Sequence, residues 1–189
     1  MKKALLIIDI QKDYFPGGKM ELEEPVKAAE NAASLLHAFR QSKETVIHVQ
    51  HTSYHEGATF FLPNTEGIEI HPLLTPIADE VVIPKNYPNS FKETKLEAYL
   101  RTNNITELVI CGMMTHICID TTVRRGSDLY LKMTLAGDAC ATRKLEYDGE
   151  IIPAKIVQAT YLASLQRFAT VKKTEEILNN LGVFQTSKN

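Results

Sequence analysis

The sequence contains no tryptophan, and its cysteines number three: Cys111, Cys118 and Cys140. Three cysteines are too few, and odd in number, for a disulfide framework, so we expect free thiols and a reducing cytoplasm. No run of about 18 apolar residues occurs, which argues against a membrane-spanning helix. The 21 basic and 23 acidic residues give a net charge of -2, and no basic cluster favours nucleic acid or an anionic membrane as a partner.

Nucleotide-binding motifs are also missing, because neither G-x-G-x-x-G nor G-x-x-x-x-G-K-[ST] occurs. Without a repeat or a linker, residues 1–189 are expected to form one domain. Short apolar runs alternate with helical patterns, which predicts a doubly wound α/β fold of the Rossmann type, with a mostly parallel six-stranded sheet and helices on both faces. The expected strands are Ala4–Ile8, Thr45–Gln50, Glu80–Ile83, Glu107–Cys111, Tyr130–Ala136 and Phe168–Val171. The expected helices are Val26–Gln41, Glu93–Thr102, His116–Gly126, Tyr147–Leu165 and Thr174–Leu181.

One segment, Thr52–Asp79, breaks this alternation, since it is long, aperiodic and contains three prolines and two glycines. Long loops in compact domains are commonly binding loops or lids. Its apolar residues exceed what a solvated loop should carry, so we expect a homo-oligomer, a dimer or tetramer, unless they pack on their own domain. Phe60 and Phe61 could cap a pocket of the same or a neighbouring subunit.

Polar residues follow several predicted strands, and in an open α/β sheet ligands bind at the carboxyl ends of the strands. Asp9 follows the first strand, His51 the second, Lys85 the third and Cys118 the fourth. Taken singly, three of them have a structural explanation: Asp9 as a turn acid, Lys85 as a solvated lysine and Cys118 as a small core thiol. Their convergence on one edge favours a site, beside the switch point if the strand order reverses between the first and fourth strands.

The chemistry of these groups is coherent. A thiol needs activation, and a helix N-terminus together with the Lys85 ammonium should lower the pKa of Cys118. The carboxylate of Asp9 can accept the thiol proton. A redox protein would instead want a second, resolving cysteine nearby, and Cys111 lies seven residues upstream within a strand.

The stretches "LLIIDIQKDYFPGG", "KNYPNSF" and "VICGMMTHICIDTT" resemble the isochorismatase-like cysteine hydrolase superfamily, which includes nicotinamidases and N-carbamoylsarcosine amidohydrolase. The resemblance covers nearly the whole chain. It implies a catalytic triad with Asp9 as base, Lys85 as electrostatic partner and Cys118 as nucleophile. It also implies a cis peptide bond between Met113 and Met114, and an oxyanion hole made by the backbone amides of Met114 and Cys118.

The resemblance fails at the metal site of nicotinamidases, where the family has an Asp-x-His pair after the second strand. Here His51 and Ser53 stand at those positions, while His55 and His71 remain at irregular spacing. We therefore expect no metal and no other cofactor. Isochorismatases that cleave a vinyl ether lack the nucleophilic cysteine, so Cys118 favours hydrolysis of a carbon–nitrogen bond.

The predicted function is thus a cysteine-dependent hydrolase that cleaves a small amide or carbamoyl-type substrate through a thioester. The alternatives are a nicotinamidase proper and a non-catalytic binding protein on the same scaffold. Aromatic walls suit a small planar amide. The candidates for substrate contact are Tyr14, Phe15, Tyr87 and Phe91. The alternative explanation for these aromatic residues is core packing.

Overall fold

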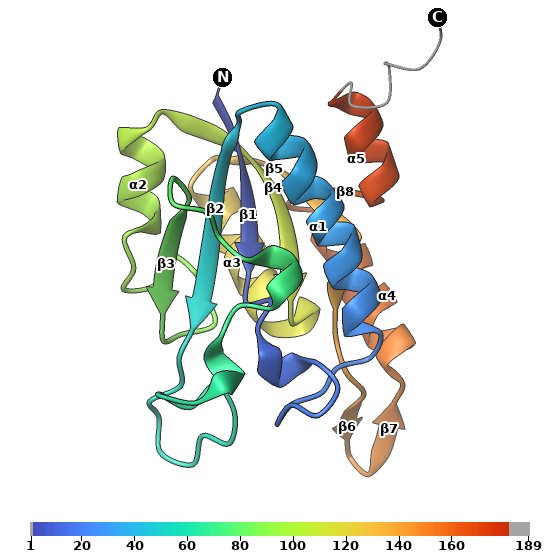
Figure 1. Ribbon diagram of the computed structural model, residues 1–189. Helices are drawn as coiled ribbons and strands as arrows, with labels where there is room; N and C mark the ends of the chain where they lie inside the picture. Colours follow the sequence, from blue (N-terminus) through green and yellow to red (C-terminus); the bar gives the residue numbers. More distant parts are fainter. Residues whose placement is uncertain (1, 182–189) are drawn as a thin grey trace, which may run out of the picture.

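A computed structural model describes residues 2–181, so residue 1 and residues 182–189 of the expected domain lie outside the described part. Six strands form one parallel sheet in the order β3-β2-β1-β4-β5-β8 (Figure 1). The expected doubly wound α/β sheet is confirmed. The strands are β1 (Lys2–Ile8), β2 (Thr45–His51), β3 (Val81–Lys85), β4 (Ile105–Met113), β5 (Lys132–Ala141) and β8 (Thr170–Lys172).

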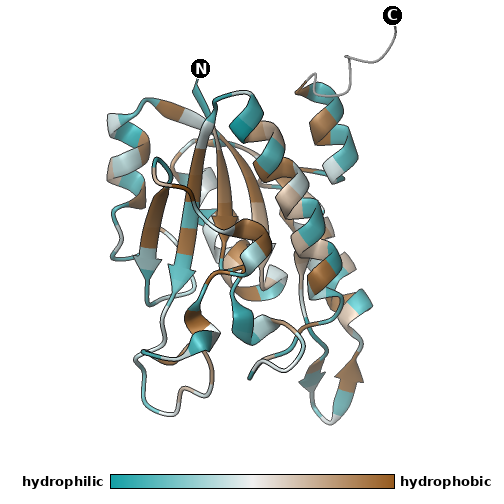
Figure 2. Cartoon of the chain, viewed as in Figure 1, coloured by the Kyte–Doolittle hydropathy of each residue, from teal (hydrophilic) through white to brown (hydrophobic). Residues whose placement is uncertain are grey.

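Helices cover both faces of the sheet, because its central strands are apolar on both sides (Figure 2). On one face Leu5 and Ile7 of β1 join a core with α1 and α5, and on the other face Leu6 and Ile8 join a core with α2, α3 and α4. Each fully buried Leu or Ile contributes about 1.5–3 kcal/mol to this packing. The helices are α1 (Pro25–Gln41), α2 (Leu96–Thr102), α3 (Asp120–Asp128), α4 (Ala154–Leu165) and α5 (Thr174–Asn180).

The strand order reverses between β1 and β4. From β1 the chain moves outward through β2 to β3, then returns to place β4 on the other side of β1 and continues to β5 and β8. The labelled arrowheads of β1, β2 and β3 in Figure 1 point toward one edge of the sheet. Residues that follow β1 and β4 therefore meet at a topological switch point, where such sheets bind ligands.

Several predicted boundaries are wrong. The helix expected at Tyr147–Leu165 begins at Ala154, because a hairpin of β6 (Leu145–Tyr147) and β7 (Glu150–Ile152) precedes it (Figure 1). Its turn, Asp148–Gly149, has positive φ at both residues, which is the geometry that Asp-Gly turns adopt. The helix expected from His116 is a π-helical turn, η4 (Thr115–Ile119), followed by α3.

Further end points differ by smaller amounts. The helix expected from Glu93 begins at Leu96, and the strand expected at Tyr130–Ala136 runs from Lys132 to Ala141. The last strand begins at Thr170 rather than Phe168. Such shifts of element ends change no feature of the sheet order.

The segment Thr52–Asp79 packs on its own domain more than the sequence suggests. Phe61 is 1% exposed and Leu74 is fully buried, whereas Leu62 and Leu73 stay 36% and 44% exposed. The carboxylate of Asp13 accepts a 2.6 Å hydrogen bond from the Phe61 amide, which holds the segment against the loop after β1. The apolar surface offered for an oligomer contact is therefore smaller than expected.

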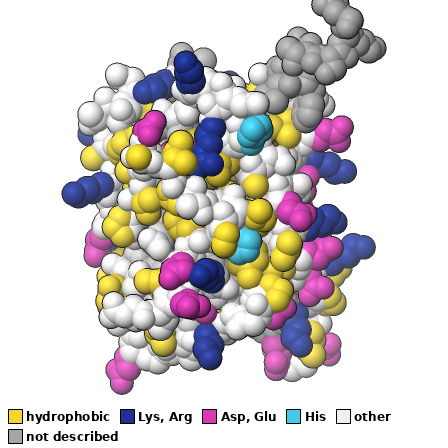
Figure 3. All heavy atoms as spheres, viewed as in Figure 1, with side chains coloured by type: hydrophobic (Ala, Val, Ile, Leu, Met, Phe, Trp, Pro, Cys, Tyr) yellow, Lys and Arg dark blue, Asp and Glu magenta, His cyan; other side chains and the backbone are white. Residues whose placement is uncertain are grey.

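Across residues 2–181, no helix combines the length and the apolar character needed to cross a bilayer. Figure 3 shows acidic and basic side chains interspersed over the face that carries α1.

Candidate active site

Asp9 comes directly after β1 and has a left-handed backbone, with φ of 52°. Aspartate tolerates this conformation better than most residues, and such outliers concentrate at functional sites. Its amide donates to the carbonyl of Val49 at 3.0 Å, which ties the turn to β2. The side chain is fully buried, and within the described residues its Oδ1 atom has no hydrogen-bond partner.

Lys85 is the last residue of β3, and its side chain is also fully buried. Its Nζ atom lies 2.7 Å from Asp9 Oδ2 in an ion pair and 3.4 Å from Cys118 Sγ. It also lies 3.1 Å from the carbonyl oxygen of Tyr87 and 2.9 Å from Nδ1 of His51. The ammonium thus stands between the carboxylate and the thiol.

Cys118 lies in the π-helical turn η4, two residues before α3 begins. π-helical turns are rare and are frequent at functional sites. The turn follows β4 closely, and the peptide bond between Met113 and Met114 is cis, at the place the resemblance implied. Gly112, with φ of 137°, lets β4 approach β1 closely at this point. A Cβ atom on residue 112 would lie 2.0 Å from the carbonyl oxygen of Ile8.

The titration properties follow from burial. Burial, and next the nearby Asp9, raise the pKa of the Cys118 thiol to about 12, although Lys85 opposes this. Burial likewise raises the pKa of Asp9 against the opposing effect of Lys85. Burial lowers the pKa of Lys85, but its interactions with Asp9 and Cys118 together outweigh burial, so that its pKa is raised. The expected lowered thiol pKa is wrong, and a thiol of this pKa is protonated at neutral pH.

A protonated resting thiol has a mechanistic consequence. The thiolate is the reactive form of a cysteine, so any attack by Cys118 would first require a base to take the thiol proton. Asp9 shares the ammonium of Lys85 with Cys118 and is a carboxylate of raised pKa, which makes it a stronger base than an exposed aspartate.

His51 is a contact of Lys85 that the sequence did not reveal. The two residues are direct partners in the parallel pairing of β2 and β3, so their side chains lie side by side on one face of the sheet. The side-chain amide of the buried Gln11 fixes the backbone of His51 through hydrogen bonds of 2.9 Å to its carbonyl and 2.7 Å from its amide. The contact between His51 and Lys85 results from the register of β2 against β3, which the sequence pattern does not predict.

The four aromatic candidates for substrate contact differ in the residues that they touch. Tyr14 is buried, and its pKa is raised well above its ordinary value, chiefly by burial and next by Cys118 and Asp9. Tyr87 contributes its carbonyl to Lys85. Phe91 belongs to the same buried cluster as Cys118, and Phe15 stacks on His71 with ring centroids 3.9 Å apart.

Phe61 covers part of the site from within the same chain. Its ring lies 4.6 Å from that of Tyr14 and 5.8 Å from that of His51, measured between centroids. Phe60 packs against Tyr14 at 5.9 Å. The long segment therefore packs over the loop after β1 of its own chain.

The histidines do not assemble into a metal centre within residues 2–181, where no group of three potential ligands comes together. His51 is directed to Lys85, His71 is stacked on Phe15, and Nδ1 of His55 contacts the neighbouring carbonyl of Glu56. His48 contacts Glu80 instead, at 2.9 Å.

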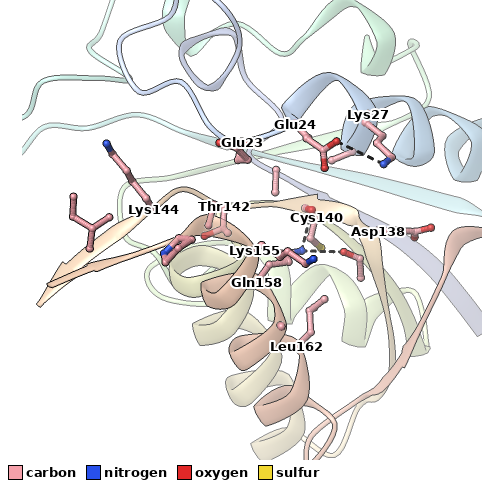
Figure 4. Close-up of a pocket in the computed structure, with 17 residues that line it drawn as sticks. Glu23, Glu24, Lys27, Asp138, Cys140, Thr142, Lys144, Lys155, Gln158 and Leu162 are labelled. Carbon is pink, nitrogen blue, oxygen red and sulfur yellow. Dashed lines mark hydrogen bonds and ion pairs between the residues drawn. The ribbon is translucent and has the colours of Figure 1, made fainter.

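A cavity of about 940 Å³ is lined by residues that do not include Asp9, Lys85 or Cys118 (Figure 4). It is bordered by the start of α1, the end of β5, the β6–β7 hairpin and α4. Gln158 bridges its wall by donating to the carbonyls of Gly137 and Cys140, both at 3.1 Å (Figure 4). A second cavity of about 520 Å³ is lined by Phe15, His71 and the loops around them, again without the triad.

The family becomes clear from comparison with known proteins, since a model described as the isochorismatase domain matches residues 3–176. The chain belongs to the isochorismatase family. The isochorismatase family protein YddQ of Bacillus subtilis is 49% identical over 94% of this chain and 99% of its own length. A crystal structure from Oleispira antarctica has a TM-score of 0.90 and 41% identity, covering 94% of this chain and 96% of that chain.

Two more distant relatives carry the names of enzymes. Streptothricin hydrolase of Streptomyces noursei is 30% identical, with 74% of this chain and 50% of that protein covered. Nicotinamidase of Escherichia coli is 27% identical, with 73% of this chain and 82% of that protein covered. Membership of the isochorismatase family confirms the expectation that this chain is a hydrolase.

Proposed function

We propose that this isochorismatase-family hydrolase cleaves a carbon–nitrogen bond of a small amide or carbamoyl-type substrate through a thioester on Cys118. The observation that supports this most is the position of Lys85 Nζ, 2.7 Å from Asp9 and 3.4 Å from Cys118 in a buried site. A base, a cation and a thiol so arranged can form and stabilise a nucleophilic thiolate. The names of the nicotinamidase and streptothricin hydrolase relatives accord with this bond type.

In the first half of the reaction, Asp9 takes the proton of the Cys118 thiol, and Sγ forms a bond to the substrate carbonyl carbon. The carbonyl oxygen becomes an oxyanion, for which the amides of Met114 and Cys118 are the proposed donors. Within the described residues the Met114 amide donates no other hydrogen bond. As the carbon–nitrogen bond breaks, the protonated Asp9 returns its proton to the leaving nitrogen, which leaves as ammonia or an amine.

In the second half, Asp9 takes a proton from a water molecule, whose oxygen attacks the thioester carbon. The carbon–sulfur bond then breaks, the thiol recovers its proton, and a carboxylic or carbamic acid is released. Lys85 keeps its proton throughout, because its charge offsets the negative charge that moves between Asp9 and Cys118.

The test is a panel of nicotinamide, carbamoyl, ureido and biuret-type amides, scored by release of ammonia and of the acid. The expected result is turnover of at least one class, none in Cys118→Ala, and an acyl adduct on Cys118 in the intact mass of wild type quenched with acid. Specific binding without turnover by the wild type would favour the non-catalytic binding protein. Release of product by Cys118→Ala at the wild-type rate would contradict the thioester.

The chain is further proposed to form a dimer or tetramer in a reducing cytoplasm. Exposed apolar side chains support an association, among them Leu73 of the long segment at 44%, Ile151 of the hairpin at 62% and Ile156 of α4 at 52% exposed. All three cysteines are free and buried. Size-exclusion chromatography with light scattering tests the assembly, and a fully active particle of about 21 kDa at micromolar concentration would contradict it.

A further inference from the structure

His51 has no role in the reaction steps above, yet it lies against the Lys85 ammonium and is 9% exposed. We propose that His51 is a positioning residue that aims one N–H bond of Lys85 at the Cys118 sulfur. This inference rests on the proposed function, since it assigns a part to a residue within the same site.

The argument begins with the donors of the ammonium. Lys85 has three N–H bonds and no acceptor. Three contacts of Nζ have the geometry of directed hydrogen bonds: His51 Nδ1 at 2.9 Å, the Tyr87 carbonyl at 3.1 Å and Cys118 Sγ at 3.4 Å. The ion pair with Asp9 Oδ2, although shorter, leaves that oxygen without a directed hydrogen bond. Two acceptors thus occupy two N–H bonds and direct the third to sulfur.

The protonation state of His51 is fixed by the same contact. Because an ammonium can donate but not accept, Nδ1 must be the unprotonated nitrogen, and the ring is the neutral Nε2–H tautomer. Burial, and next the charges of Lys85 and His55, lower the pKa of His51 to about 3, which keeps the ring neutral at physiological pH.

A neutral acceptor differs from a carboxylate in what it does to the ammonium. It holds Nζ in place without cancelling the positive charge that the thiolate and the oxyanion need. Among residues 2–181, Asp9 is the only carboxylate that forms an ion pair with Nζ, and it is itself the proposed base. Gln11 makes the support rigid, because it fixes the His51 backbone from both sides.

The first experiment needs no substrate. NMR of protein labelled with ¹⁵N-histidine should show His51 as the Nε2–H tautomer from pH 5 to pH 9, with the signal assigned by its loss in His51→Asn. Replacement of the donor in Lys85→Met should shift the His51 Nδ1 resonance. A His51 that carries its proton on Nδ1, or a resonance that Lys85→Met leaves unmoved, would overturn the inference.

The second experiment compares two variants at the same position. The side-chain oxygen of asparagine stands near the place of Nδ1 and can accept from Lys85, whereas leucine in His51→Leu cannot. Alkylation of Cys118 by iodoacetamide at pH 8, followed by peptide mapping, should be slower in His51→Leu than in wild type, with His51→Asn close to wild type. Far-UV circular dichroism confirms that both variants are folded.

The third experiment uses an amide that the wild type hydrolyses. Loss of a hydrogen bond to a charged group should reduce kcat/KM by about 10- to 100-fold in His51→Leu, while His51→Asn retains most activity. Since the buried ammonium loses an acceptor in His51→Leu, its pKa falls, and the alkaline limb of the pH profile should move to lower pH. Equal kcat/KM and pH profiles in His51→Leu and wild type would overturn the inference and leave the proposed function intact. Silence of the wild type on every amide would count against the proposed function alone, because the first two experiments use no substrate.

Discussion

The buried pair of Asp9 and Lys85 makes a stability prediction that can be worked through. Lys85→Met removes the cation and leaves the carboxylate of Asp9 fully buried beside no counter-charge. Loss of one partner of a buried ion pair typically costs about 3–5 kcal/mol of the free energy of unfolding. Variants of Asp9 or Lys85 are therefore expected to lose stability as well as activity. If these side chains were exposed at the edge of the sheet, their loss would cost little stability. The double variant Asp9→Asn with Lys85→Met removes both charges and should recover most of the loss.

The loss of stability in Lys85→Met should also depend on pH, in a direction that can be worked out. Burial already raises the pKa of Asp9 above 3.8 against the opposing effect of Lys85, and Lys85→Met removes that opposition. The folded state of the variant then binds the Asp9 proton more tightly than the unfolded state does. Its free energy of unfolding should fall as pH rises above about 4, by up to about 1.4 kcal/mol per pH unit, until the folded-state pKa is passed.

The assay is urea unfolding followed by far-UV circular dichroism, because the chain has no tryptophan for fluorescence. Lys12→Met is the matched control, since Lys12 pairs with Glu69 at the surface, where the two side chains are 37% and 56% exposed, and little change is expected. If Lys85→Met and the double variant have the same free energy of unfolding at every pH, the reasoning about the buried carboxylate is refuted.

Three further predictions follow from other contacts. Gly112→Ala should lower the melting temperature by circular dichroism and reduce activity, because its Cβ would meet the Ile8 carbonyl, whereas Gly149→Ala, also at positive φ but with open space around it, is the control; equal losses would contradict the contact. Although burial opposes it, hydrogen bonds from Arg40 and the Ile77 amide lower the pKa of Glu80 from 4.5 to about 2, so its stabilisation is present above pH 4.5 and lost as pH falls through about 2. The deficit of Glu80→Gln in urea unfolding should accordingly be full at pH 6 and shrink toward pH 2, and a deficit independent of pH would contradict it. EDTA should leave turnover unchanged, because His51 is engaged with Lys85, and a loss that zinc, iron or manganese restores would show otherwise.

The sequence predicts the sheet well because its strands are buried on both faces and stand out as continuous apolar runs. The β6–β7 hairpin was missed because Ile151 and Ile152 continue the apolar pattern of α4, although Asp148–Gly149 is a turn signal that could have revealed it. Its two strands form a separate small sheet, so the alternation of apolar runs and helical patterns that predicts the main sheet does not predict them.

For the site, residue types and positions after strands were enough to select Asp9, Lys85 and Cys118. The pKa of Cys118 could not be inferred, because it depends on how completely the packed helices exclude water from the thiol. The contact of His51 with Lys85 depends on the register of β2 against β3, which the apolar pattern of these strands leaves open.

The reversal of strand order between β1 and β4 divides the working parts of the site between two segments of the chain. Four of the residues precede residue 90: Asp9, His51, Lys85 and Tyr87. Cys118 follows β4, on the other side of β1. A cut in the connection between α2 and β4, at residues 103–104, would place the charged pair on one fragment and the thiol on the other. Activity regained on mixing the fragments would then measure how faithfully β4 docks beside β1.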